Sequence, residues 1–329
     1  MQPDEARLSC GIKRSSLFLI RGDIVESTTK HYFGSVDYIK AIAIVAVVLT
    51  HAGLRGTDPA LTPFEKIIRQ SWVGFQVPAF FLVAGFLYHQ AGPIAWREVA
   101  RRVLRIVIPY LVASVLAILL GFSRNLQLKT ILFDVATGNT LGIYYFVFAL
   151  CLCIPFVWLF SRLPAPILWA VLASLLGYSA LMAFGYLPRP IQGMFWSVRG
   201  LFFTFFLGYF VTGWLIAHHL DSLRALFIPI KVFILPPLLM GAAFYVSLRS
   251  QAIWDDSAPG RTFSFYNIVY TLSVTGLIVL FTHTLRVPRL VRFLSEASLT
   301  IYLYHRLFQF ELLPFTSEWS TLARVLSML

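Results

Sequence analysis

Residues 35–51 read Ser-Val-Asp-Tyr-Ile-Lys-Ala-Ile-Ala-Ile-Val-Ala-Val-Val-Leu-Thr-His, and this stretch decides the fold. Ten residues without a charge separate Lys40 from His51. A membrane-spanning helix needs about 20 mostly apolar residues, and the stretch predicts such a helix over 36–54. Ionisable groups are costly in hydrocarbon, so Asp37, Lys40 and His51 are candidates for a structural or functional role within the membrane.

Eight further segments of the chain have the same apolar character. The 329 residues are 58% hydrophobic and 13% charged, with a mean hydropathy of +0.75. A soluble domain is about 45–50% apolar and about 25% charged, so an ordinary soluble enzyme and a disordered chain are excluded. We expect an all-α fold, a polytopic membrane helix bundle of about nine to ten transmembrane helices. The expected spans after the first are 71–90, 103–121, 141–160, 165–186, 199–217, 227–247, 266–285 and 298–315.

Positive charge lies mostly between these apolar segments. The net charge is +12, from 27 Lys and Arg against 15 Asp and Glu. In a membrane protein this pattern marks cytoplasmic loops and sites for anionic ligands or headgroups, so we expect no nucleic-acid partner. Two clusters fall on one side, which the positive-inside rule makes cytoplasmic together with the N-terminus. The clusters are Arg97, Arg101, Arg102 and Arg105, and Arg286, Arg289 and Arg292.

Composition also suggests how the chain is divided. Residues 1–35 are polar and basic, so we expect an N-terminal arm there and a single membrane domain over 36–329. The three cysteines, Cys10, Cys151 and Cys153, lack the spacing of a metal site or a disulfide framework, and no metal is expected.

Lys40 and His51 are positioned to share one side of the first helix. They are eleven residues apart, about three turns, which places them on nearly the same face and roughly 16 Å apart in height. Asp37 precedes Lys40 by three residues and can pair with it. A histidine that faces a bundle interior can accept a proton from a hydroxyl near neutral pH. The alternative is that Lys40 snorkels to the headgroups and His51 only marks the far end of the helix.

Two other sets of polar residues lie in or beside the apolar segments. Arg101 and Arg105 lie one turn apart with Arg102 beside them, and guanidinium groups suit phosphates. The alternative for them is a positive-inside anchor. Near the end of the chain, Tyr302 and His305 are close neighbours on one helical face, or else belong to an aromatic belt with an interfacial histidine.

The residues from Asp37 to His51 resemble the opening of the acyltransferase 3 family, integral membrane O-acyltransferases. The family signature is Arg, ten residues, His, and Lys40 stands in the Arg position, as in the branch related to fucose 4-O-acetylases. The resemblance extends along the chain, although Ala84 replaces a family Ser. The further matching stretches are Val77–Phe86, the Arg101, Arg102 and Arg105 pattern, Phe203–Gly208 and Ile301–His305.

This resemblance implies a membrane O-acetyltransferase of a bacterial inner membrane. The acyl donor would be cytoplasmic acetyl-CoA, and the acceptor a sugar hydroxyl of an envelope or exopolysaccharide glycan or of its lipid-linked precursor. His51 would act as general base or accept the acyl group transiently, and Lys40, fixed by Asp37, would orient the donor or offset negative charge. The three arginines would hold the phosphates of acetyl-CoA, and Tyr302 and His305 would contact the acceptor.

Two other functions are compatible with polar groups inside a helix bundle. A glycolipid transporter or flippase would move its substrate without acyl transfer. A membrane sensor or scaffold would keep the fold without the chemistry, as the departures at Lys40 and Ala84 allow. The enzymatic hypothesis requires Lys40 and His51 to face one chamber that the arginines can reach.

Overall fold

The computed structural model describes residues 33–52, 63–90, 92–122, 127–183, 203–250 and 265–316. Contacts divide the chain into two units, Met1–Tyr32 and Phe33–Leu329, and every described residue belongs to the second unit. Within the described ranges the regular structure is helical and no strand occurs, which confirms the all-α prediction. The predicted arm over residues 1–35 lies almost entirely outside the described residues, and the predicted division remains a prediction.

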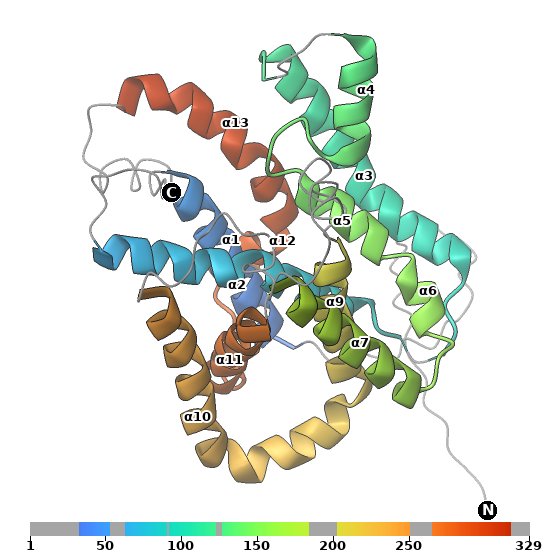
Figure 1. Ribbon diagram of the computed structural model, residues 1–329, viewed down its shortest axis with the longest axis vertical. Helices are drawn as coiled ribbons and strands as arrows, with labels where there is room; N and C mark the ends of the chain where they lie inside the picture. Colours follow the sequence, from blue (N-terminus) through green and yellow to red (C-terminus); the bar gives the residue numbers. More distant parts are fainter. Residues whose placement is uncertain are drawn as a thin grey trace, which may run out of the picture. The chain divides into compact units, whose positions relative to one another are not determined.

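Twelve helices are described, and Figure 1 shows them along the chain from α1 in blue to α13 in red. They are α1 (Ser35–Ala52), α2 (Pro63–Tyr88), α3 (Trp96–Leu119), α4 (Leu128–Thr137), α5 (Tyr145–Cys153), α6 (Phe156–Phe160), α7 (Ala165–Ala183), α9 (Phe203–His218), α10 (Leu220–Ser250), α11 (Phe265–Thr282), α12 (Arg289–Glu296) and α13 (Ser298–Thr316).

Each of the nine expected spans overlaps at least one of these helices. The expected span 141–160 consists of α5 and α6, which are separated by a turn at Ile154 and Pro155. Proline has no backbone N–H to donate to the preceding turn, so a break at this position is expected. The short helices α4 and α12 were not predicted. Gly138 ends α4 with φ at 75°, a left-handed conformation that glycine adopts without strain.

The helices α2 and α9 cross with their backbones in close contact. A Cβ added to Gly85 of α2 would collide with the backbone carbonyl of Phe210, and one added to Gly213 of α9 would collide with the carbonyl of Leu82. Only glycine allows two helix backbones to approach this closely. This reciprocal pair therefore fixes α2 against α9 at the centre of the bundle, beside stacked rings of Phe81 and Phe206.

Pro78 lies inside α2 and changes how that helix pairs with its neighbour. Because proline cannot donate to the carbonyl four residues earlier, the oxygen of Gly74 is released from the helix. Thr271 Oγ1 of α11 lies 3.3 Å from this oxygen and is buried with it. The break in α2 is thus compensated by a neighbouring helix, as is common in membrane bundles.

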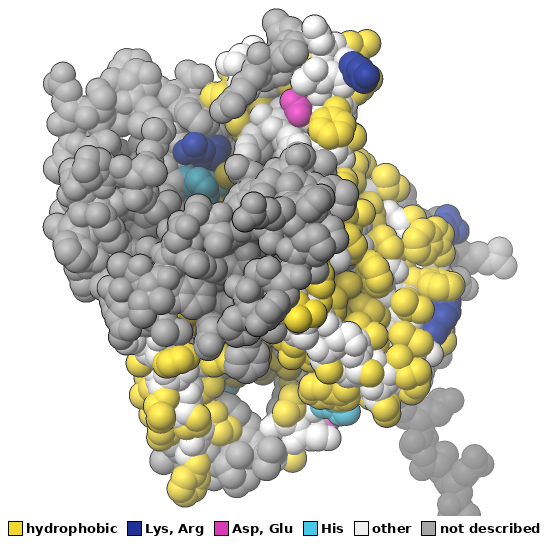
Figure 2. Space-filling view, viewed as in Figure 1, with side chains coloured by type: hydrophobic (Ala, Val, Ile, Leu, Met, Phe, Trp, Pro, Cys, Tyr) yellow, Lys and Arg dark blue, Asp and Glu magenta, His cyan; other side chains and the backbone are white. Residues whose placement is uncertain are grey.

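Large apolar side chains are exposed on the outside of several helices. The exposed fraction reaches 77% for Leu119 of α3 and 78% for Phe233 of α10. Figure 2 shows hydrophobic side chains over much of the face where α3 and α6 lie. By length and composition, Ser71–Tyr88 and Trp96–Leu119 of the described residues are each able to cross a membrane, and five shorter apolar helices accompany them. Exposed apolar faces of this extent suit lipid as the surrounding solvent.

Candidate active site

The structure brings two of the predicted histidines together. His51 lies at the end of α1 and His305 in α13, and their rings meet edge to face with centroids 5.2 Å apart. His51 is half-buried, whereas His305 is 6% exposed. The sequence predicted these residues separately, one as a catalytic group and the other as an acceptor-binding group. Packing of α1 against α13 makes them neighbours.

Backbone carbonyls fix the tautomer of both rings. His51 Nδ1 lies 2.8 Å from the oxygen of Val47, and His305 Nδ1 lies 2.8 Å from the oxygen of Tyr302 and 3.1 Å from that of Ile301. A carbonyl oxygen only accepts hydrogen bonds, so Nδ1 carries the proton in both neutral rings. Nε2 then holds the lone pair in each ring, which is the form required of a general base.

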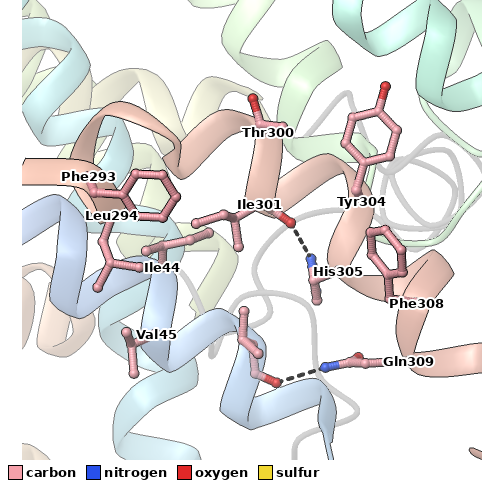
Figure 3. Close-up of a pocket in the computed structure, with 11 residues that line it drawn as sticks. Ile44, Val45, Phe293, Leu294, Thr300, Ile301, Tyr304, His305, Phe308 and Gln309 are labelled. Carbon is pink, nitrogen blue, oxygen red and sulfur yellow. Dashed lines mark hydrogen bonds between the residues drawn. The ribbon is translucent and has the colours of Figure 1, made fainter. Parts of the chain in front are cut away.

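A cavity of about 600 Å³ lies beside this histidine pair. Three of its lining residues come from α1, namely Ile44, Val45 and Val48, and the remainder from α12 and α13, including His305 and Gln309. Figure 3 shows Ile44 of α1 between Leu294 of α12 and Ile301 of α13, with His305 and Gln309 further along α13. The walls of the cavity are mostly apolar, as in typical small-molecule sites.

The α1 wall of the cavity occupies the face between Lys40 and His51. Ile44 follows Lys40 by one helical turn, Val48 follows Ile44 by another, and His51 lies three residues further on. Neither Lys40 nor His51 itself lines the cavity. The space therefore runs along the helix face that the spacing of Lys40 and His51 singled out, with His305 as the histidine on its wall.

Lys40 is half-buried near the start of α1, and the negative charges of two carboxylates attract its ammonium group. Asp37 is one turn earlier in the same helix, and Glu296 is the last residue of α12. Asp37 also accepts a hydrogen bond of 2.5 Å from the hydroxyl of Ser295, which joins α1 to α12. The structure thus gives Asp37 a positioning contact between two helices, while its role toward Lys40 in catalysis stays a prediction.

Four contacts place both arginine clusters at the end of the bundle where α1 begins. The rings of Phe33 and Phe86 are 5.8 Å apart, so α2 ends where α1 starts. Arg102 of the first cluster donates to the Tyr88 carbonyl at the end of α2.

Two further contacts of α1 place the second cluster at the same end. Ser35 bonds with Thr282 at the end of α11, and Tyr38 donates to the carbonyl of Arg286 in the second cluster. The two clusters therefore share one side, as predicted, and His51 lies at the opposite end of α1.

The three predicted phosphate-binding arginines differ in environment. Arg102 is 7% exposed and donates to Glu98 and to the carbonyl of Tyr88, over whose ring its guanidinium also lies at 5.0 Å. Arg101 is exposed and forms an ion pair with Glu98 at 2.7 Å, and Arg105 is exposed. Arg102 therefore holds α3 to the end of α2, and its two neighbours are the groups that present charge at the surface. None of the three lines the cavity beside the histidines, so the predicted chamber that Lys40, His51 and the arginines share stays a prediction.

Tyr302 is buried and its hydroxyl is already used in packing. It donates to the carbonyl of Ile143, and in the reciprocal direction the hydroxyl of Tyr144 donates to the carbonyl of Leu303. These two bonds tie α13 to the segment before α5. The predicted contact of Tyr302 with the acceptor stays a prediction, whereas its neighbour His305 does line a cavity.

Other polar groups were not singled out from the sequence. Gln309 is 3% exposed, lines the cavity and donates from Nε2 to the carbonyl of Val48 at 3.1 Å. Its spacing of one turn after His305 was the available signal.

A second pair of histidines lies near the end of α2 that Arg102 contacts. His89 Nε2 lies 3.4 Å from His218 Nδ1, and the His89 ring meets Trp214 edge to face. Among the described residues no group of three metal-ligating side chains forms, and the expectation of no metal stays a prediction.

The fold and the site define a class of protein, a helical membrane protein in which a buried histidine, His305, meets a half-buried one, His51, beside an apolar cavity. The family model described as an acyltransferase domain matches residues 33–328. The chain therefore belongs to the acyltransferase 3 family and is a membrane acyltransferase. No curated protein and no solved structure matches it. Membership of the branch related to fucose 4-O-acetylases stays a prediction.

Proposed function

We propose that the chain transfers an acetyl group from acetyl-CoA to a sugar hydroxyl of an envelope or exopolysaccharide glycan, or of its lipid-linked precursor. The observation that carries this proposal is the His51–His305 pair, edge to face at 5.2 Å beside an apolar cavity. A histidine beside a cavity supplies the proton acceptor that activation of a hydroxyl requires, and apolar walls disfavour the water that would hydrolyse the thioester.

In the proposed reaction, His51 is the base. The O–H bond of the acceptor breaks, its proton passes to Nε2 of His51, and the oxygen bonds to the thioester carbonyl carbon. The carbon–sulfur bond then breaks, and the CoA thiolate leaves and recovers the proton from His51. Lys40 orients the donor or offsets the negative charge that develops, and Asp37 holds its end of α1 against α12. Transient acylation of His51 would give the same products in two steps.

The donor enters from the end of the bundle that carries the arginines. Its phosphates interact with Arg101 and Arg105, both exposed, while Arg102 keeps α3 in place against α2. The pantetheine arm then extends between the helices toward His51, which lies at the far end of α1. This arrangement is consistent with a donor from the cytoplasm of a bacterium, with the N-terminus on the same side, and an acceptor bound toward the other face or from within the membrane.

Labelled acetyl-CoA added to membranes that contain the chain tests the proposal directly. We expect acid-stable label to appear in the extracted glycan or glycolipid and to depend on His51. A flippase, the second function compatible with these polar groups, would move a glycolipid between leaflets without any requirement for acetyl-CoA. Glycolipid movement that needs no acyl donor, with no label in any glycan, would replace the proposal by that alternative.

Replacing Arg105 by alanine is expected to raise the KM for acetyl-CoA by about tenfold and to leave the KM for the acceptor unchanged. The reason is the loss of a charge-assisted hydrogen bond to a phosphate, whose contribution is about 1.5–3 kcal/mol. The same variant is expected to use acetyl-pantetheine, which lacks the nucleotide phosphates, as well as the wild type does. Steady-state transfer assays with both donors measure this difference.

Arg289→Ala is the matched control for that experiment. Arg289 is an equally exposed arginine that α12 places at the same end of the bundle. An equal effect of both substitutions, or an equal effect of Arg105→Ala with both donors, would show that the arginines only anchor the chain in its orientation.

A further inference from the structure

Two residues that line the cavity carry acceptor atoms without a partner. Among the described residues, neither Nε2 of His305 nor Oε1 of Gln309 has a hydrogen-bond partner. Both residues are more than nine-tenths buried. A buried polar atom without a partner costs roughly 1–3 kcal/mol, so two such atoms on residues of one cavity wall mark a place where a ligand completes the hydrogen bonding.

The chemical character of both atoms follows from their backbone contacts. Nδ1 of His305 faces two carbonyl oxygens and is the protonated nitrogen, which leaves Nε2 as an acceptor. The amide of Gln309 faces the carbonyl of Val48, which only accepts, so its nitrogen must lie there and Oε1 is the atom without a partner. Figure 3 shows the amide nitrogen of Gln309 bonded toward α1. The site therefore offers two acceptors and requires a ligand that donates twice.

The spacing of His305 and Gln309 along α13 suits neighbouring hydroxyl groups. His305 and Gln309 are one turn apart on α13, so their Cβ atoms are about 5–6 Å apart. Side chains that leave one helix face this close together can bind two neighbouring hydroxyls of one sugar, each of which donates a bond of about 2.7–2.8 Å. An anionic group is disfavoured, because both atoms would repel it. The aromatic rings of Phe293, Tyr304 and Phe308 on the cavity wall suit the apolar face of a sugar ring.

We propose that the cavity between α1, α12 and α13 binds the acceptor sugar, and that Gln309 and His305 together recognise hydroxyl groups next to the one that is acylated. This inference rests on the proposed function and specifies its substrate class, a glycosyl unit with at least three contiguous hydroxyls. The hydroxyl to be acylated lies at His51, whose ring contacts that of His305. Because both acceptor atoms are closed off from solvent, the side chains around them shift when the sugar binds.

Gln309 is a positioning residue in this arrangement, and substitution by methionine tests it. Methionine has nearly the same length and volume but no hydrogen-bonding amide. The full chain in lipid nanodiscs is supplied with a panel of methyl glycopyranosides and the monodeoxy analogues of each. Gln309→Met is expected to raise the KM for the glycoside by about tenfold, to leave the KM for acetyl-CoA unchanged, and to weaken glycoside binding in saturation-transfer NMR. With the analogue that lacks the recognised hydroxyl, wild type and variant are expected to behave alike.

Gln76→Met is the matched control. Gln76 is also buried at 4% exposure and also bonds to α1, where Thr50 Oγ1 lies 3.2 Å from its Oε1, but it does not line the cavity. The inference is overturned if both substitutions change glycoside use equally, if the Gln309→Met effect is the same for every deoxy analogue, or if no glycoside binds the wild type. Binding that depends on Gln309 without transfer of label from acetyl-CoA would instead overturn the proposed function and leave the sugar site in place.

Discussion

Replacing His51 by alanine is expected to lower the rate of acyl transfer by about 10²–10⁴-fold, the usual contribution of a positioned general base. Membrane insertion and abundance are expected to stay near those of the wild type, because His51 is only half-buried at the end of α1. The measurement is transfer of labelled acetyl groups to glycan in membranes, normalised to the amount of chain. Full activity of the variant would reject His51 as the base.

His283→Ala is the matched control for His51. His283 follows the end of α11, and its Nδ1 also lies within hydrogen-bonding distance of a backbone carbonyl, that of Leu280 at 2.9 Å. It is exposed and does not line the cavity. We expect this variant to retain wild-type activity, so an equal loss in both variants would attribute the effect of His51→Ala to general disturbance of the protein.

Replacing Gly85 or Gly213 by alanine is expected to cause a larger loss of stability than alanine at any other glycine in the described ranges. In each case the new Cβ would lie 1.9 Å from a backbone carbonyl oxygen of the facing helix, that of Phe210 or Leu82. Backbone atoms cannot turn aside as a flexible side chain can, so α2 and α9 would have to separate. Overpacking typically costs about 1–3 kcal/mol, and we expect these two variants at or above the upper end of that range.

The stability experiment compares thermal unfolding of purified variants in one detergent, followed by fluorescence or by the fraction that remains monodisperse after heating. Gly177→Ala is the control, because nothing lies within 4 Å of a Cβ added there and the helix propensity of alanine is higher. We expect Gly177→Ala to unfold at or slightly above the wild-type temperature and the other two well below it. Equal behaviour of all three variants would show that the α2–α9 crossing does not control stability.

Several features of the fold could be predicted because they depend on neighbouring residues in the chain. Apolar runs of sufficient length indicated the helices, and each expected span overlaps at least one. The break at Pro155 and the short helices α4 and α12 were missed, since a hydropathy window averages over a single proline and passes over helices of 8–10 residues. Helical periodicity also placed Lys40 and His51 on one side of α1, and the cavity lies along the face between them.

The composition of the candidate site could be predicted only in part. Sequence spacing grouped Arg101, Arg102 and Arg105, but it could not show that Arg102 is buried against Tyr88 while the other two are exposed. It paired Tyr302 with His305, although the hydroxyl of Tyr302 is bonded to a carbonyl near α5. Burial and hydrogen bonding of these side chains depend on which other helix packs against them.

The sequence by itself determined that this protein is a bundle of apolar helices, that two arginine clusters follow helices on the same side of the alternating topology, and that Lys40 and His51 lie on one face of the first helix. These are consequences of local composition and of the period of the helix. Only the tertiary structure decided that His305 meets His51, that Gln309 reaches α1, and that two buried acceptors share a cavity. The physical reason is that contacts between α1 and α13 depend on how helices far apart in the chain pack, which helical periodicity does not specify.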